Sequence, residues 1–201
     1  GELRIGVTYG LSSLLTPVLV EFSAKYPDVK IMVEFGTSQE LLDKLRSARV
    51  DFLLSFLELQ DNELFISQRL YDSPLTLVAH VSNGISNKKS VSMKELQDIP
   101  LVLPAKGFHT RQFLNEALAN NSIKPNIKME LNDINTLLQL VETGNWCTIM
   151  TVAAVKARKT LKTIPIKGLN IISQASITWP KDSYRKKSVL IFTEMIQNQV
   201  K

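Results

Sequence analysis

Small hydroxyl-bearing residues follow three apolar segments near the start of the chain. Segment 3–7 leads into Gly-Leu-Ser-Ser, segment 29–35 into Gly-Thr-Ser, and the apolar triplet 52–54 into a serine. Hydroxyls and backbone N–H groups at such positions can hold a small anion, above all where a helix begins. The candidate ligand-binding residues of this first half are Gly10, Ser12, Ser13, Thr37, Ser38, Ser55 and Phe56.

These residues also have ordinary structural explanations. Ser12 and Ser13 can cap a helix, and Thr37 opens a Thr-Ser-Gln-Glu capping box. A capping hydroxyl nevertheless keeps a hydrogen that it can donate to a ligand. Ser55 can bond to backbone at the end of an apolar strand, and Phe56 can belong to the core. Binding and structural roles therefore both stay open here.

The second half of the chain offers a more charged set. His109 and Arg111 could complement an anion through charge-assisted hydrogen bonds. Alternatively, the histidine belongs to the surface or core, and Arg111 pairs with Glu116 or Asp133. Asn132 and Asp133 can likewise cap the helix that follows them. The candidate ligand-binding residues here are Phe108, His109, Thr110, Arg111, Asn132 and Thr151.

No catalytic set accompanies these candidates. The sequence has no serine–histidine–aspartate signature, no paired carboxylates in a known motif, no glycine-rich phosphate loop and no zinc-ligand spacing. The single cysteine, Cys147, excludes an internal disulfide and argues against a thiolate metal site. We therefore expect no enzyme activity, no cofactor and no bound metal.

The elements that must position the candidates alternate between strand and helix. The first set is a strand at 3–7, a helix at 13–26, a strand at 29–35, a helix from the capping box at 37–40, and a strand at 51–55. After extended segments at 64–70 and 75–80, a second set has strands at 101–103, 127–131 and 147–150 and helices at 111–119, 134–143 and 152–159. Gly144 suits the residue that ends helix 134–143.

The last segments are a strand at 170–178 and a helix that starts at Asp182. Its inward residues are expected to be Val189, Leu190, Phe192, Thr193 and Ile196. Apolar strands joined by helices indicate parallel sheets covered on both faces, so the pattern predicts two similar α/β lobes. Strands near 75–80 and 171–178 could cross between the lobes, which would make a hinge and a cleft.

The composition of the 201-residue chain fits this picture. Hydrophobic residues make up 44%, and the net charge of +5 comes from mostly scattered lysines. That distribution favours a solvated surface over direct contact with nucleic acid. No apolar run approaches the roughly 18 residues of a membrane helix, so we expect no membrane partner. The single cysteine favours a reducing compartment, so we expect a cytoplasmic location.

Several stretches together resemble the regulatory domain of LysR-type transcriptional regulators. They are Gly-Glu-Leu-Arg-Ile-Gly-Val at the start, residues 14–29 through Tyr-Pro-Asp-Val, residues 33–45, and Arg-Val-Asp-Phe-Leu-Leu at 49–54. The resemblance extends over nearly all of the chain. Residues 108–111, 132–134 and 137–141 look most like the branch that contains cyanate-operon regulators.

The resemblance implies a type 2 periplasmic-binding-protein fold, with two Rossmann-like lobes joined by a two-strand hinge. Lobe I would comprise 1–78 plus 171–201, and lobe II 79–170. A small-molecule effector would bind in the cleft between the lobes, and the hydroxyl-rich helix starts together with Arg111 suggest that it is an anion. DNA would be bound by an N-terminal winged helix-turn-helix that this chain lacks, within a homodimer or homotetramer whose DNA-head spacing responds to the effector.

The chain departs from the family pattern at three positions. Trp146 stands where a second glycine is usual, and Thr151 stands in place of a proline. Gly10 occupies a position where some relatives carry a serine that contacts the effector. The departures at Trp146 and Thr151 put the usual shape of that wall of the site in question. At Gly10, either Ser12 and Ser13 supply the contact instead or the contact is lost.

Three other functions compete with a regulatory domain. A secreted solute-binding protein of a transporter could share the fold, and the upstream sequence would distinguish it. An enzyme on this fold would need a catalytic carboxylate or lysine in the cleft. A pure interaction domain would have a cleft closed by apolar side chains.

Overall fold

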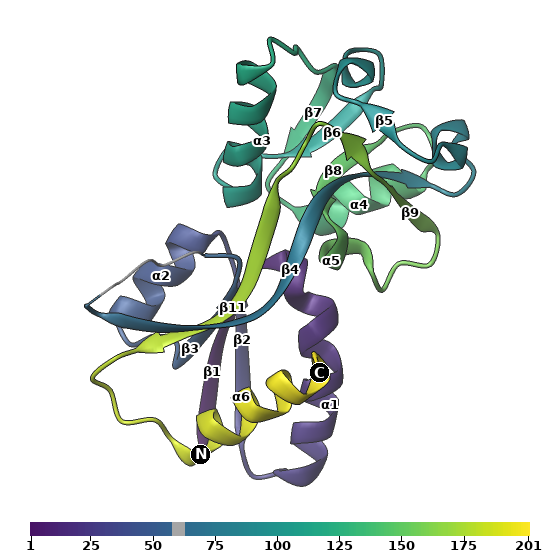
Figure 1. The fold of residues 1–201 in the computed structure, drawn as a ribbon. Coiled ribbons are helices and arrows are strands. Elements are labelled where there is room, and N and C mark those ends of the chain that lie inside the picture. Colours follow the sequence, from purple (N-terminus) through teal and green to yellow (C-terminus); the bar gives the residue numbers. More distant parts are fainter. Residues whose placement is uncertain (58–62) are drawn as a thin grey trace. The chain divides into compact units, whose positions relative to one another are not determined.

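The computed structural model describes residues 1–57 and 63–201, which form two compact units (Figure 1). Unit 1 comprises residues 1–72 and 174–201, and unit 2 comprises residues 73–173. Two strands, β4 (Phe65–His80) and β11 (Ile172–Pro180), contribute residues to both units. The extended segments expected at 64–70 and 75–80 are thus one continuous strand.

The sheet of unit 1 is built on three parallel strands: β1 (Glu2–Val7), β2 (Lys30–Phe35) and β3 (Phe52–Ser55). The central strand is β1, and its last residue, Val7, pairs with Phe35 on one side and Leu54 on the other. β11 then adds to β3 in antiparallel orientation, so the order is β2-β1-β3-β11. The parallel strands thus end at one shared edge.

Helices cover both faces of this sheet, as the sequence predicted. They are η1 (Tyr9–Leu11), α1 (Ser12–Lys25), α2 (Ser38–Arg46) and α6 (Lys187–Gln199). On one face the leucines of α2 join a cluster with Leu53. On the other face, α1 and α6 lie side by side (Figure 1), and Phe192 packs 5.1 Å from Phe22 and 5.9 Å from Phe52 between ring centroids.

Unit 2 repeats this plan with the strands β5 (Val91–Ser92), β6 (Leu101–Pro104), β7 (Ile127–Leu131), β8 (Thr148–Thr151), β9 (Leu161–Ile164) and β10 (Ile166–Lys167). β6 runs parallel to β7, with Pro104 opposite Leu131. A parallel bridge joins Leu101 to Cys147, directly before β8. β4 pairs antiparallel with both β8 and β9.

The helices of unit 2 are η2 (Gly84–Asn87), η3 (Lys94–Gln97), α3 (His109–Asn120), α4 (Ile134–Glu142) and α5 (Val152–Val155). Leu114 and Leu118 of α3 pack into the main core cluster of the unit. The buried face of α4 contacts β6 and β7. Gly144 has a φ of +89° after the end of α4, so its predicted role in ending this helix is confirmed.

Two helix boundaries differ from the sequence-based expectation by more than two residues. The C-terminal helix starts at Lys187 instead of Asp182, because Lys186 pairs with Asp51 at 2.8 Å and Arg185 lies over the Trp179 ring, which holds the preceding loop outside the helix. Helix 152–159 stops at Val155, since the chain turns there towards β9.

The expectation that Leu190 faces inward is also wrong. Its side chain is 48% exposed, whereas Val189, Phe192, Thr193 and Ile196 are buried as predicted.

The part of the chain that the structure describes contains no helix long and apolar enough to cross a membrane. Within residues 1–57 and 63–201, no three histidine, cysteine, aspartate or glutamate side chains gather to hold a metal ion.

We predict that Phe192→Ala lowers the free energy of unfolding by about 3–5 kcal/mol, because it removes the ring that joins α1, α6 and the sheet. Leu190→Ala, on the same helix but half-exposed, is the control and should change it by at most about 0.5 kcal/mol. Urea denaturation measures both values. Equal losses for the two variants would contradict the assigned face of α6.

Candidate functional site

The carboxyl edge of the unit 1 sheet brings the first group of candidates together. Residues 8–13, 36–38 and 55–56 follow the in-register ends of β1, β2 and β3. Backbone hydrogen bonds fix this edge, with Thr8 N–H donating to the Leu54 carbonyl at 3.0 Å and Gly36 N–H to the Val7 carbonyl at 3.4 Å. The N-termini of α1 and α2 therefore begin at one edge of one sheet.

Thr37 holds the start of α2 through the predicted capping box. Its Oγ1 accepts the Glu40 N–H at 3.3 Å, and its own N–H donates to the Glu40 carboxylate at 2.9 Å. These bonds, the backbone one first, hold the pKa of Glu40 below its usual range. The Thr37 hydroxyl still has a hydrogen to donate. Ser38 is the first residue of α2 and is half-buried.

Ser12 and Ser13 do not cap α1, which corrects one of the two explanations offered for them. The N-cap is Leu11, without a side-chain cap bond, and the two serines are the first residues of the helix. Ser12 Oγ instead donates back to the Tyr9 carbonyl at 3.1 Å. Ser13 is half-buried beside it, and Gly10 lies in the 3-10 turn η1.

Ser55 and Phe56 are part of the interior of unit 1. Ser55 is fully buried, and its Oγ accepts the Leu57 N–H at 3.3 Å. Phe56 is only 5% exposed. Both positions thus fit the structural explanations given for them.

Sequence reasoning missed an aromatic pair at this edge. The rings of Tyr9 and Phe35 stack with centroids 5.1 Å apart and an interplanar angle of 22°. Phe35 is 40% exposed although it ends β2. The available signal was an aromatic residue at a strand end or two positions after it, directly before Gly10 and Gly36.

The carboxyl edge of the unit 2 strands gathers the second group. Residues 105–111 follow β6, Asn132 and Asp133 follow β7, and Thr151 ends β8. Asp133 caps α4 by accepting the Thr136 N–H at 2.9 Å, as predicted. The Thr136 side chain, together with its backbone N–H, lowers the pKa of Asp133. Asn132 is exposed next to this cap.

Arg111 fastens α3 to the strand ends of unit 2. Its side chain is 2% exposed, and its Nη1 donates to the Pro104 carbonyl at 2.6 Å and to the Glu130 carboxylate at 3.2 Å. Its Nε donates to Asn115 at 2.8 Å. The pairing suggested with Glu116 or Asp133 is wrong, because Arg111 turns inward from the first turn of α3 towards the end of β7.

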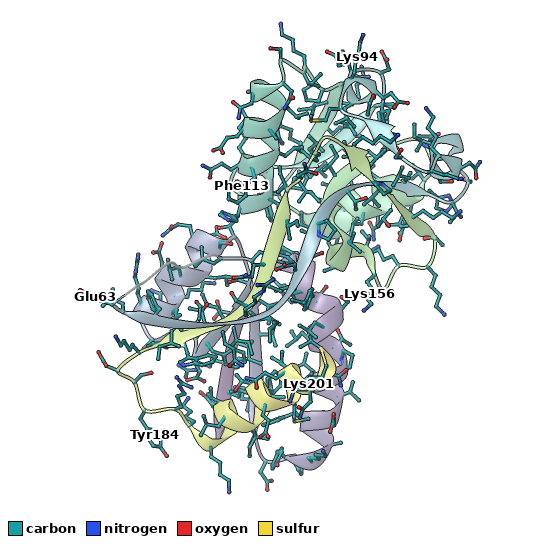
Figure 2. The ribbon with its side chains drawn as sticks, viewed as in Figure 1. Glu63, Lys94, Phe113, Lys156, Tyr184 and Lys201 are labelled. Carbon is teal, nitrogen blue, oxygen red and sulfur yellow. The ribbon has the colours of Figure 1, made fainter. Side chains whose placement is uncertain are left out.

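The remaining candidates of unit 2 lie around the start of α3 and α5. Phe108 is the half-buried N-cap of α3, and His109 and Thr110 are its first residues. The His109 ring packs edge-on against Phe113, with centroids 4.5 Å apart, and Figure 2 shows Phe113 on α3. Thr151 is buried at the N-cap of α5 and makes no side-chain cap bond there.

A residue outside the predicted set supports the start of α5 instead. Ser73 Oγ accepts the Ala153 N–H at 2.9 Å, and Ser73 is itself buried. This contact joins residues 80 positions apart in the sequence, so no local pattern indicated it.

In open α/β sheets, small molecules bind beyond the carboxyl ends of the strands, where helices begin, and each unit carries polar residues at such an edge. Residues 1–201 match the family model described as the LysR substrate binding domain. The chain therefore belongs to this family, as its sequence resemblance indicated.

Its relatives are named as transcriptional regulators. The chain is 27% identical over 151 residues to the HTH-type transcriptional activator CmpR of Synechocystis. The matched region covers 75% of this chain and 49% of CmpR. It is 26% identical over 201 residues to the HTH-type transcriptional regulator BsdA of Bacillus subtilis, covering 97% of this chain and 68% of BsdA. The chain thus spans about half of CmpR. The likeness to CmpR accords with the branch that the resemblance suggested.

Solved structures show the same fold. The Synechocystis PCC6803 CcmR regulatory domain in complex with 2-PG has a TM-score of 0.84 at 16% identity, covering 100% of this chain and 98% of that one. The effector binding domain of QuiR in complex with shikimate has a TM-score of 0.79 at 14% identity, covering 100% and 97%. The predicted type 2 periplasmic-binding-protein fold is confirmed.

We predict that Arg111→Gln destabilises the chain by about 2 kcal/mol, because its charged hydrogen bonds join α3 to β6 and β7. The control is Arg69→Gln, which breaks the exposed pair with Asp72 and should cost at most about 0.5 kcal/mol. Chemical denaturation would refute the anchoring role if both variants were equally stable.

Cys147 should be almost inert, since it is 1% exposed and burial raises the pKa of its thiol to about 11. At pH 8 we expect iodoacetamide to alkylate it roughly a hundredfold more slowly than a small free thiol. The same measurement in urea, where the thiol is exposed, provides the control. Similar rates in the folded and unfolded chain would show that the thiol is accessible.

Proposed function

We propose that this chain is the effector-sensing and oligomerisation domain of a LysR-type DNA-binding transcriptional regulator. The observation that carries the proposal is the family match over residues 1–201, on a fold whose strand ends gather polar groups at helix N-termini. Relatives such as CmpR and BsdA are named as regulators, which supports regulation over transport or catalysis.

The effector we propose is a small anion, such as a carboxylate. Helix N-termini carry partial positive charge, and α1, α2, α3 and α4 each begin at a strand edge that holds candidate residues. The CcmR and QuiR domains, which share this fold, were solved with the small molecules 2-PG and shikimate. Direct contacts are proposed for Gly10, Ser12, Ser13, Thr37, Ser38, Phe108, His109, Thr110 and Asn132.

Four buried candidates are proposed to act by shaping the same edges. Ser55, Phe56, Arg111 and Thr151 all have side chains that are largely inaccessible. Arg111, whose positive charge is paired with Glu130, holds the start of α3 in place through its hydrogen bonds. That one effector contacts residues of both units stays a prediction, which variants in each unit test.

The proposed mechanism is a shift in populations. An effector that binds one conformation of the regulator more tightly increases the population of that conformation. An effector with equal affinity for two conformations would leave their populations unchanged. We propose that the favoured conformation changes the spacing of DNA-binding heads in a homodimer or homotetramer in the cytoplasm. A helix-turn-helix encoded upstream of residue 1 would support this, whereas an upstream secretion signal would favour a solute-binding protein.

A thermal-shift screen of small carboxylates and inorganic anions, cyanate included, tests effector binding. At about 100 times its dissociation constant, a specific anion should stabilise the fold by about 2.7 kcal/mol and raise the melting temperature by about 5–10 °C. No shift from any compound in the screen would contradict a small-anion effector.

Thr37 provides the matched variants for this screen. Thr37→Asp keeps an oxygen that can cap α2 but adds a negative charge, so the chain should stay folded and lose the anion-induced shift. Thr37→Ser keeps the hydroxyl and should retain it. An undiminished thermal shift in Thr37→Asp would show that Thr37 does not contact the anion. Asn132→Asp tests the contact proposed in unit 2 in the same way.

A further inference from the structure

A pocket lies in unit 2, at the opposite end of its strands from the candidate effector residues of that unit. Pro100 directly precedes β6, Cys147 directly precedes β8, and Asn83 follows the end of the antiparallel strand β4. All three line one pocket of about 330 Å³. This volume falls within the range of roughly 300–1,000 Å³ that is typical of small-molecule sites.

The interior of this pocket is apolar. Ile99 and Cys147 are buried, and Ile85 and Pro100 complete the apolar wall. Because burial raises the pKa of Cys147 to about 11, its thiol stays neutral at physiological pH. The interior therefore suits a short hydrocarbon body.

The side-chain amide of Asn83, in the pocket wall, already forms hydrogen bonds within the protein. Asn83 Nδ2 donates to the Gly144 carbonyl at 2.9 Å, and its Oδ1 accepts the Ile85 N–H at 3.0 Å. Its Nδ2 also lies 3.9 Å from Cys147 Sγ. These bonds hold the amide in one orientation, so a ligand need not supply hydrogen-bond partners for it.

Among the residues that line the pocket, the carboxylates of Glu95 and Asp98 outnumber the single ammonium group of Lys88. Lys88 pairs with Glu95, and Glu95 also accepts the Ser92 N–H at 2.7 Å. These bonds, that from Lys88 first, lower the pKa of Glu95 to about 2. Asp98 is exposed and forms no ion pair with any residue in the described ranges. The Lys88 ammonium group is therefore compensated by Glu95, and the Asp98 carboxylate remains available to attract a cation.

We propose that this pocket is a second ligand site, which binds a small organic cation with a short apolar body. The ammonium group sits beside Asp98, and the hydrocarbon chain packs on Ile85 and Ile99. The turn η3, whose first residue Lys94 is labelled in Figure 2, carries Glu95 to the rim. The site is independent of the proposed anion effector, because it lies at the amino ends of β6 and β8 and has the opposite charge preference.

Titration of the isotope-labelled chain with n-butylammonium chloride, followed by amide NMR, tests the proposal. We expect saturable shifts centred on Ile85, Ile99 and Cys147. Butyrate, which has an anionic head on a similar hydrocarbon body, should produce none there. Shifts that do not saturate, that scatter over the surface, or that are equal for the two probes would overturn the proposal.

Three exposed variants sharpen this test without touching the core. Asp98→Asn should weaken n-butylammonium binding by about fivefold, the upper range for an exposed ion pair. Lys88→Gln should strengthen it, because it removes the competing cation. Lys89→Gln, next to it but outside the pocket wall, should leave the affinity unchanged. Equal affinities of all three variants for n-butylammonium would show that the charges at the pocket rim do not contribute to binding, which would contradict the proposed cation site.

Discussion

The in-register parallel pairing of β1 with β2 and β3 is the constraint on which the rest of unit 1 depends. Val7 pairs with both Phe35 and Leu54, so three strands end at the same edge. A parallel strand must be followed by a crossover on the face of the sheet, and two of these crossovers begin with helices at that edge. Pro104 opposite Leu131 imposes the same geometry on unit 2. The polar edges are consequences of this topology.

Several residues at these edges hold the following helices in place, and Thr37 and Asp133 among them also remain accessible to solvent. Thr37 and Asp133 cap the helices that follow them, and Arg111 anchors α3 to two strands. A substitution that removes a cap or an anchor changes stability as well as any binding. Variants that keep the capping oxygen while changing charge separate the two effects, which is why Thr37→Asp is more informative than a truncation.

Local signals in the sequence were sufficient for much of the fold. The capping box at Thr37, the cap at Asp133 and the helix end at Gly144 each depend on residues within a few positions, and all three are confirmed. The alternating strands and helices were likewise predicted, because burial on both sheet faces produces continuous apolar runs.

Long-range contacts account for what the sequence did not reveal. The start of α6 depends on Lys186 meeting Asp51, 135 positions away in the chain. The partner of Arg111 is Glu130, on a neighbouring strand rather than on its own helix.

The aromatic stack and the pocket in unit 2 have the same kind of origin. The stack of Tyr9 on Phe35 requires the register of β1 and β2. The pocket requires Asn83, Pro100 and Cys147 to meet at one sheet end. The periodicity within a single segment does not predict contacts between residues of different segments.

Hydrogen–deuterium exchange, measured with and without the anion that gives the largest thermal shift, tests the central claim most directly. A regulatory domain that senses its effector at the strand edges should gain protection at 8–14 and 36–41, and at 105–112 and 132–136. Protection confined to other segments, such as 83–100, would contradict the assignment of the effector site to these edges.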